Sequence, residues 1–514
     1  MAQFSLVKSA AVLGIDAYIV DVECNLSNAQ LPLFVTVGLP EGAVKESKER
    51  VWSAIRNAGF YIPSNRIVIN LAPADIRKEG SSFDLPIAIG ILSAANFVSP
   101  DKLKDYILLG ELSLDGTLRD IKGALPISVS VRESGIRGMI LPIQNAKEAA
   151  ITGELEIIGV RSLTETIEFL NDNFQPPRVE VDVNALFEEH RHYPVNFSDV
   201  KGQEHVKRAL EVAAAGAHNI IMIGPPGSGK TMLAKRLPTI LPDLTLAEAL
   251  ETTKIHSVAG LIPPGQGIVA TRPYRAPHHT ISDAALVGGG KFPRPGEVSL
   301  SHNGVLFLDE LPEFKKNVLE VMRQPLENGN VTISRAQMSL TYPASFMLVA
   351  AMNPCPCGYA TDPQHQCTCT QSQIQKYMAR ISGPLLDRID IHIEVPAVKF
   401  TDLASKSSGE PSEIIRQRVQ EARKIQLRRF ASMRGIYANA HMDTRLIRKY
   451  CAIDNACEEL LRTAINKLGL SARAYDRILK VARTIADLAA SETIRPEHIA
   501  EAIQYRSLDR HLWL

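Results

Sequence analysis

A glycine-rich run at 224–231, Gly-Pro-Pro-Gly-Ser-Gly-Lys-Thr, has the residue types that bind phosphate groups. It matches the pattern G-x-x-x-x-G-K-[ST] at every fixed position. Glycines let backbone N–H groups surround phosphate oxygens, and a helix that begins there adds favourable potential. Lys230 would reach the β- and γ-phosphates, and the Thr231 hydroxyl would bind Mg²⁺. The run therefore predicts a site for ATP and Mg²⁺ formed by Gly224, Pro225, Pro226, Gly227, Ser228, Gly229, Lys230 and Thr231.

Two acidic residues follow a short apolar run in Val305-Leu-Phe-Leu-Asp309-Glu310. This pattern predicts a strand with both carboxylates at its carboxyl end, the edge at which parallel sheets bind ligands. Asp309 would hold the Mg²⁺ shell, and Glu310 would position and polarise an attacking water. A further apolar run, Phe346–Ala351, leads to Asn353. Its amide either orients the same water or is an ordinary turn residue.

These groups need a scaffold that brings them together. Ile220–Ile223 is an apolar strand directly before the glycine-rich run, and Met232–Leu241 has the pattern of a helix directly after it. From Phe197 onward, apolar strands alternate with helical segments, which is typical of a parallel sheet covered by helices. The fold class expected for residues 197–400 is therefore α/β.

The rest of the chain divides around this segment. Residues 173–196 lose periodicity and contain three prolines, so a linker is expected there. The polar stretch Thr401–Pro411 marks a second boundary, and residues 411–514 are almost entirely helical in pattern. Residues 1–172 mix short strands at Tyr18–Val22, Phe34–Val37, Arg66–Leu71 and Tyr106–Leu109 with helical stretches such as Gly42–Ala58, which predicts an α+β domain.

The overall charge neither favours nor excludes nucleic acid. Lys and Arg total 57, Asp and Glu total 56, and a net charge of +1 creates no global field. Any DNA contact must therefore be local. The N-terminus lacks a signal-peptide pattern, and the apolar run Phe346–Met352 is far too short to span a bilayer. We expect a cytoplasmic location and no membrane partner.

Four of the seven cysteines lie within fifteen residues, at Cys355, Cys357, Cys367 and Cys369. Thiols clustered in this way in a cytosolic protein are typical of tetrahedral Zn²⁺ and not of a disulfide framework. The spacing is C-x-C twice, whereas C-x-x-C is commoner, so four reduced thiols in a surface loop are the alternative. A structural Zn²⁺ here would brace the loop after Asn353.

Longer segments carry a family resemblance. The glycine-rich run, the acid pair and Asn353 look like an AAA+ ATPase core. The chain further resembles the YifB/ComM family of magnesium-chelatase-like bacterial ATPases in Pro-Glu-Gly-Ala-Val-Lys-Glu-Ser at 40–47, Arg-Pro-Tyr-Arg-Ala-Pro-His-His at 272–279, Ile-Ser-Gly-Pro-Leu-Leu-Asp-Arg-Ile-Asp at 381–390 and Leu-Ser-Ala-Arg-Ala-Tyr-Asp-Arg at 470–477. The resemblance implies an AAA+ P-loop core, an N-terminal domain similar to Lon proteases (ribosomal S5 domain 2-like) and an all-helical C-terminal lid.

The resemblance also implies a homo-hexameric ring with ATP between subunits. Asn353 then takes the sensor-1 role. Arg388 would be the arginine finger that completes the neighbour's site, and Arg473 would be the sensor-2 residue that reaches ATP from the lid. A fixed planar cation suits both roles because it neutralises charge that develops on the γ-phosphate. Arg380 is a second candidate for the finger, and an ordinary surface ion pair is the alternative for each arginine.

The family has an insert before the acid pair, and related motors use such loops to hold DNA in the pore of the ring. In this chain the interval from Thr231 to Asp309 is long, and a hairpin is expected at Gly329–Tyr342. Contacts from Arg and Lys to phosphates bind DNA without regard to sequence. The DNA-binding candidates are Arg272, Arg275, Lys291 and Arg335; solvated loop charge is the alternative.

The N-terminal resemblance to Lon proteases can be checked residue by residue. Ser82, in Glu-Gly-Ser-Ser-Phe-Asp, aligns with the nucleophile, but Leu125 occupies the position of the base lysine. A serine without a base is a weak nucleophile. Lys122 lies nearby in the sequence, so a displaced base is the alternative. The domain is expected to serve in assembly or DNA guidance and not in proteolysis.

The family resemblance implies a ring-forming DNA motor, a branch-migration helicase that promotes recombination in natural transformation. Its partners would be branched or single-stranded DNA and other recombination proteins. Three alternatives are a chelatase-like motor that remodels a protein partner, a Lon-like ATP-dependent protease and a non-catalytic nucleotide-binding scaffold. The fused N-terminal domain disfavours the first, Leu125 the second, and the intact Lys230, Asp309 and Glu310 the third.

Overall fold

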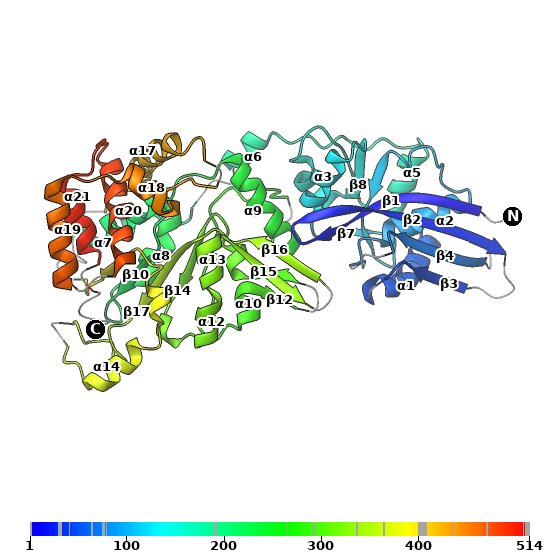
Figure 1. Ribbon diagram of the computed structural model, residues 1–514. Helices are drawn as coiled ribbons and strands as arrows, with labels where there is room; N and C mark the ends of the chain where they lie inside the picture. Colours follow the sequence, from blue (N-terminus) through cyan, green and yellow to red (C-terminus); the bar gives the residue numbers. More distant parts are fainter. Residues whose placement is uncertain are drawn as a thin grey trace. The chain divides into compact units, whose positions relative to one another are not determined.

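The computed structural model divides the chain into two compact units. The first contains Met1–Arg191 and Leu246–Ala270, and the second contains His192–Thr245 and Thr271–Leu514. Each unit is described by itself (Figure 1). The structure describes all residues except 1–2, 29–32, 41, 63–64, 75–77, 79, 190–192, 264, 291–292, 336–337, 363–364, 399–408, 434, 469–470, 507 and 509–514.

The first unit is built on a seven-stranded mixed sheet in the order β3-β4-β2-β1-β5-β8-β9. A long antiparallel ribbon of β1 and β2 forms its centre, β4 pairs antiparallel with β2, and the outer strands pair in parallel. A two-stranded sheet of β6 and β7 lies beside it. The strands are β1 (Gln3–Leu13), β2 (Asp16–Asn28), β3 (Leu33–Val37), β4 (Asn65–Ala72), β5 (Tyr106–Leu108), β6 (Glu111–Leu112), β7 (Leu118–Arg119), β8 (Gly138–Pro142) and β9 (Glu156–Val160).

Helices of the first unit contribute to two apolar cores. Alternate residues of β1 divide between the cores, with Val7 in one and Ala10 in the other, as the period of a strand requires. The first core includes side chains of α1 (Gly42–Asn57), α2 (Asp84–Ala94) and α5 (Leu163–Leu170), and the second those of α3 (Ala124–Glu133) and α4 (Ile143–Ala150). The unit also contains α6 (Val183–Glu189) and α9 (Leu246–Ala259).

The place of α9 differs from the sequence-based division, which assigned residues 197–400 to one domain. The Ser257 carbonyl accepts from the Gly123 N–H at 3.2 Å, directly before α3. A methyl group added at Gly260 would meet Lys122 at 2.6 Å. The segment Leu246–Ala270 therefore packs as part of the first unit, although it is encoded between strands of the second.

The second unit contains a five-stranded parallel sheet in the order β11-β14-β17-β10-β18. The strands are β10 (Ile220–Ile223), β11 (Tyr274–Arg275), β14 (Val305–Leu308), β17 (Met347–Met352) and β18 (Ile391–Glu394). The strand expectations at 220–223 and 305–308 are confirmed, and β17 begins and ends one residue later than expected. The helix expected at Met232–Leu241 is wrong in part, because α8 (Lys230–Arg236) gives way to a 3₁₀ turn that contains Pro238.

Every element of secondary structure described between Ser412 and Gln504 is a helix. Its helices α17 (Ser412–Arg429), α18 (Thr444–Tyr450), α19 (Asn455–Leu468), α20 (Ala472–Leu488) and α21 (Pro496–Gln504) share one apolar core with the parallel sheet and α7 (Glu204–Gly216). The remaining elements are α10 (Asp283–Val287), β12 (Gly288–Gly289), β13 (Arg294–Pro295), α11 (Glu297–Leu300), α12 (Lys316–Val321), α13 (Arg323–Asn328), β15 (Asn330–Arg335), β16 (Met338–Pro343), α14 (Gln371–Met378) and α15 (Gly383–Leu386).

Candidate nucleotide site

The glycine-rich run forms a tight loop between β10 and α8. Gly227 and Gly229 have φ values of 76° and 88°, which side chains rarely adopt. A Cβ atom at Gly224 would lie 2.0 Å from the Val395 carbonyl oxygen, so only glycine fits there. The loop thus has the backbone geometry that phosphate binding needs at the start of a helix.

Lys230 points into this loop. Its Nζ donates to the carbonyl oxygens of Gly224 at 2.8 Å and Pro225 at 2.9 Å. Burial lowers the pKa of this ammonium to about 8, against the opposing attraction of Asp309. A desolvated cation surrounded by carbonyl oxygens is well placed to exchange these partners for phosphate oxygens.

The neighbouring strand ends bring the acid pair and the amide beside the loop. The Thr231 hydroxyl donates to Asp309 Oδ2 at 2.7 Å, which places two hard oxygen ligands together, as Mg²⁺ prefers. Asn353 directly follows β17, which lies between β10 and β14. Its Oδ1 lies 3.3 Å from Lys230 Nζ. The spacing alone left Asn353 as a possible turn residue, and the structure places its amide within reach of the loop.

His279 contacts the second acid, which the sequence analysis did not anticipate. Its Nδ1 lies 3.3 Å from Glu310 Oε2, and its ring stands against those of His278 and Phe314. Glu310 has a φ of 52°. Its carboxylate is therefore directed by a left-handed backbone and by a residue of a preceding segment. The only sequence signal was the pair of histidines at 278–279.

The arginines expected to sense or complete the site lie at the opposite edge of the sheet. Asn219 directly precedes β10, and its Nδ2 donates to the Arg388 carbonyl at 3.0 Å. Arg473 Nη1 lies 3.0 Å from Asp387 Oδ2. Because β10 has four residues, its two ends are separated by roughly 10–13 Å. Arg473 thus lies beside the Arg388 turn and away from the phosphate loop of its own chain.

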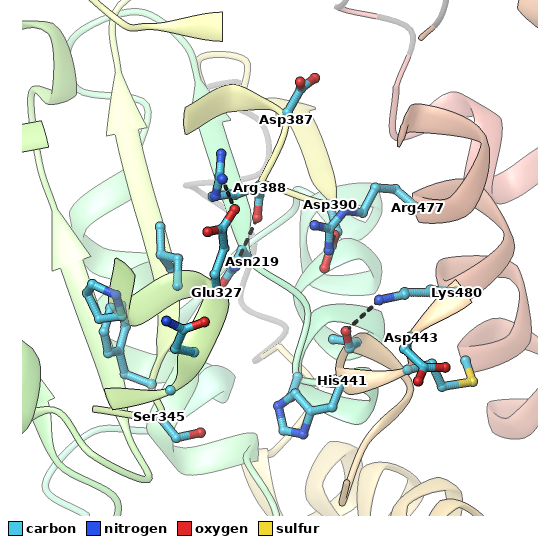
Figure 2. A pocket seen from close by; sticks show the side chains of 18 of the residues that line it. Asn219, Glu327, Ser345, Asp387, Arg388, Asp390, His441, Asp443, Arg477 and Lys480 are labelled. Carbon is cyan, nitrogen blue, oxygen red and sulfur yellow. Dashed lines mark hydrogen bonds and ion pairs between the residues drawn. The ribbon is translucent and has the colours of Figure 1, made fainter. Parts of the chain in front are cut away.

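These arginines line a cavity of about 500 Å³. Asn219, Ser345 and Asp390 mark the amino ends of strands there (Figure 2). Arg388, Arg473, Arg477 and Lys480 contribute positive charge. Burial, with the cations Arg323, Arg473 and Arg477, lowers the pKa of Arg388.

Acidic side chains balance part of the charge in this cavity. The Arg388 guanidinium pairs with Glu327, and Arg477 Nη1 lies 2.8 Å from Asp390 Oδ1. The Nε of Arg388 is buried and has no hydrogen-bond partner among the described residues. Arg388 therefore keeps a buried guanidinium donor without a partner in the described part of the chain, in a cavity that three further cations line.

Arg380 occupies a third position. Its Nη1 pairs with Glu313 at 2.8 Å, and the Glu313 N–H donates to the Glu310 carbonyl. Arg380 therefore forms an ion pair, which was the alternative role expected from the sequence. Its partner Glu313 lies close in the chain to the acid pair.

The structure separates the four DNA-binding candidates. Arg272 donates to the backbone carbonyls of Asn303 at 2.7 Å and Asp243 at 3.2 Å, and Arg275 forms a two-bond pair with Glu297 at 2.6 and 2.8 Å. Both side chains are engaged in bonds within the fold. Lys291 lies outside the described residues.

Arg335 is exposed at the end of β15. Its Nε lies 3.4 Å from the Gly290 carbonyl, so the β15–β16 hairpin adjoins the turn after β12. Among the four candidates, Arg335 is the described residue whose exposure suits contact with a macromolecule.

Ser82, Leu125 and Lys122 are the residues on which the comparison with Lon proteases rests. Leu125 is fully buried, and its N–H donates to Glu148 Oε1 at 3.0 Å. Ser82 is half-buried, and its carbonyl accepts from the Gly110 N–H at 2.9 Å. Lys122 lies against Gly260. No hydrogen bond joins Ser82 to Lys122 in the described part of the chain, so Ser82 has no activating base there.

The four clustered cysteines converge in space. The sulfurs of Cys355, Cys357, Cys367 and Cys369 all lie within 4.8 Å of one another, and His365 is not in the group. Four converging sulfurs are a ligand set for structural zinc, so the cluster is compatible with zinc.

Family profiles define the class of protein. The profile described as "Magnesium chelatase, subunit ChlI" matches residues 196–403, and that of its C-terminal part matches 409–506. A third, "Subunit ChlI of Mg-chelatase", matches residues 22–145. With the mixed α/β fold and the parallel sheet, these matches define a magnesium-chelatase-like AAA+ protein, a class that suggests ATPase activity and implies ATP and Mg²⁺.

Relatives identify the family within this class. The chain is 45% identical to "Competence protein ComM" of Haemophilus influenzae and 43% identical to "Uncharacterized protein YifB" of Escherichia coli, over 99% of this chain and 98% of each relative. It is 27% identical to the magnesium-chelatase 38 kDa subunit of Rhodobacter capsulatus over 31% of this chain and 50% of that protein. The chain belongs to the ComM/YifB family.

No helix in the described ranges combines the length and the apolar character needed to cross a bilayer.

Proposed function

We propose that this chain hydrolyses ATP at sites shared between copies in a homo-hexameric ring and uses the energy to move DNA. The observation that carries the proposal is the separation of the site into two halves. Lys230, Asp309 and Asn353 gather at the carboxyl ends of the strands, whereas Arg388 and Arg473 lie at the amino ends. Neither of these two arginines lies at the phosphate loop of its own chain.

Within the first half, each residue has a chemical role. Lys230 neutralises charge on the β- and γ-phosphates, and the oxygens of Thr231 and Asp309, 2.7 Å apart, hold the Mg²⁺ shell. Glu310 polarises the attacking water once it turns from His279. Asn353 donates to this water or to the γ-phosphate. A Mg²⁺ ion held by Thr231 and Asp309 would supply positive charge that stabilises the phosphates.

The second half completes a neighbour's site. The cavity that Arg388 lines carries three other cations, which suits a phosphate group from another chain. Asp387 holds Arg473 beside Arg388, so the two act together on the neighbour's nucleotide. Sensor 2 then acts between chains and not within one.

The proposed substrate is DNA, branched or single-stranded and without sequence preference. Support comes from the full-length relative whose name describes a competence protein and from the exposed Arg335 at the hairpin end. We infer a branch-migration helicase that promotes recombination in natural transformation and works with other recombination proteins. The motion would come from the hairpin as the ring passes through its cycle.

The test is ATP-dependent migration of a synthetic four-way junction by the full chain. Wild type should resolve the junction with Mg·ATP, and Lys230→Ala should bind DNA but fail to move it. ATP turnover that proceeds without junction movement on any branched or single-stranded substrate would contradict the DNA-motor proposal.

A chelatase-like remodeller of a protein partner is the second candidate. It is favoured by the matches of residues 196–403 and 409–506 to magnesium-chelatase profiles. DNA stimulation of ATP turnover separates the two candidates. A DNA motor should be stimulated with a salt-dependent affinity, whereas a remodeller should be indifferent to DNA.

A further inference from the structure

The cysteine cluster has the dimensions of a metal site. The sulfur of Cys355 lies 3.3 Å from that of Cys357 and 3.7 Å from that of Cys367, and the last two are 3.6 Å apart. A tetrahedral Zn²⁺ with bonds of about 2.3 Å requires sulfurs about 3.8 Å apart. A disulfide requires about 2.05 Å. The spacing therefore fits four ligands around one ion better than two oxidised pairs.

The loop that carries the cluster lies directly against the phosphate loop. Gly358 is buried with a φ of 90°, and a Cβ atom there would lie 2.6 Å from Pro226 Cδ. The same atom would lie 3.9 Å from Asn353 Cγ. A 3.0 Å bond between the Gly358 N–H and the Cys355 carbonyl closes the Cys355–Gly358 turn. This turn thus packs on Pro226 of the phosphate loop and beside Asn353.

The far end of the loop returns to the same place. After Cys369 the chain enters α14, which begins at Thr370 with a reciprocal capping interaction. Tyr377 of this helix is buried, and its hydroxyl accepts from the Asn353 backbone N–H. Asn353 is therefore contacted from both ends of the loop, and the cysteine cluster joins these two ends.

Little else orders this loop. Its described residues between Pro354 and Cys369 form no helix or strand, and Pro354 and Cys355 are the buried apolar side chains among them. His365 bonds Asp362 at 3.0 Å and stacks on Tyr359, which is a local contact at the surface. A segment without a core needs a cross-link to keep one shape.

We propose that Cys355, Cys357, Cys367 and Cys369 bind one structural Zn²⁺, and that the bound metal clamps Gly358 against Pro226 and fixes Asn353. The affinity for nucleotide then depends on the metal. This proposal rests on the nucleotide site proposed above but not on DNA or on movement. It assigns the cluster a supporting role, because the contact with the phosphate loop is made by Gly358.

The experiment measures zinc by elemental analysis and the Kd of a fluorescent ATP analogue, both on the full chain without DNA. Wild type should carry one zinc per chain, and Co²⁺ substitution should give the visible spectrum of a tetrahedral tetrathiolate. Cys357→Ser should lose the metal and bind nucleotide roughly tenfold or more weakly, as misplaced phosphate contacts imply. His365→Ala is the matched control and should keep both properties.

A second variant guards against simple misfolding. Gly358→Ala keeps all four thiols but adds the methyl group that meets Pro226. It should retain zinc and still bind nucleotide more weakly, with wild-type circular dichroism. Wild type without zinc or cobalt binding would overturn the metal site. Zinc loss in Cys357→Ser with unchanged nucleotide affinity would overturn the clamp. Neither the zinc measurement nor the nucleotide Kd uses DNA. Both results therefore remain informative even if the chain does not move DNA.

Discussion

Replacing Lys230 by Met should stabilise the nucleotide-free protein while abolishing ATP binding. Burial lowers the pKa of the ammonium from an ordinary 10.5 to about 8. That depression corresponds to at most about 3 kcal/mol against the charged form. Solvent access at the loop and the lost bonds to Gly224 and Pro225 reduce the net gain to about 1 kcal/mol.

The pH dependence follows from the same shift. Between pH 8 and 10.5 the unfolded chain binds more protons at this lysine than the folded chain, so wild-type stability rises with pH across this window. The Met variant lacks that rise. Its advantage should therefore be fully present at pH 7, and should disappear and then reverse as the pH rises toward 10.5.

The assay is thermal unfolding of both proteins without nucleotide at several pH values. At pH 7 the Met variant should unfold roughly 1–2 °C higher. With Mg·ATP the order should reverse, because only wild type gains from ligand binding. A Met variant that is less stable than wild type at pH 7, or a stability difference that does not change with pH, would refute the reasoning.

Three further predictions concern ATP turnover, the stability of the fold and DNA binding. Glu310→Gln should bind Mg·ATP with near wild-type affinity but lose about 10²- to 10⁴-fold in turnover, measured by phosphate release. Arg272→Ala should lower the melting temperature, since it removes bonds to Asn303 and Asp243, while the salt dependence of DNA affinity stays unchanged. Arg335→Ala should keep the melting temperature but weaken DNA binding and reduce the slope of log K against log salt by about 1.

Each of these has an opposing outcome. Normal turnover in Glu310→Gln would assign water activation to another group. An unchanged melting temperature in Arg272→Ala would contradict its bracing role, and a reduced salt slope there would restore it as a DNA contact. Wild-type DNA affinity in Arg335→Ala would remove the hairpin from the DNA surface.

The phosphate loop could be predicted from sequence because its requirements are local. The backbone at Gly227 and Gly229 needs positive φ, and the close approach at Gly224 excludes a side chain. The strands Ile220–Ile223 and Val305–Leu308 are short, apolar and fully buried, so their pattern stands out. The polar side chains at their ends then share one edge of the sheet.

The remaining features depend on contacts between residues distant in the chain. Ser257 bonds Glu148 of the first unit across a separation of 109 residues, and no local pattern signals this pairing. The sequence predicts Arg275 as a free basic residue, whereas in the fold Glu297 pairs with it. His279 reaches Glu310 only because the strand order places their segments together.

The place of Arg473 was the least predictable. The motif Ser-Ala-Arg identified the residue, but its distance from the phosphate loop is set by how α20 packs on α7 and the sheet. Asp387 then holds it beside Arg388. The sequence identifies Arg473, but only the fold shows at which end of the strands this residue lies.

The most direct measurement of the central claim is ATP turnover by mixtures of Lys230→Ala and Arg388→Ala chains. Each variant alone should be nearly inactive, since every site lacks either the lysine or the arginine. Random mixed rings should recover up to about one quarter of wild-type turnover, because some interfaces then pair an intact Lys230 with an intact Arg388. The double variant mixed with Arg388→Ala should recover nothing. Full activity of Arg388→Ala alone, or no recovery in rings shown to be mixed, would contradict the account.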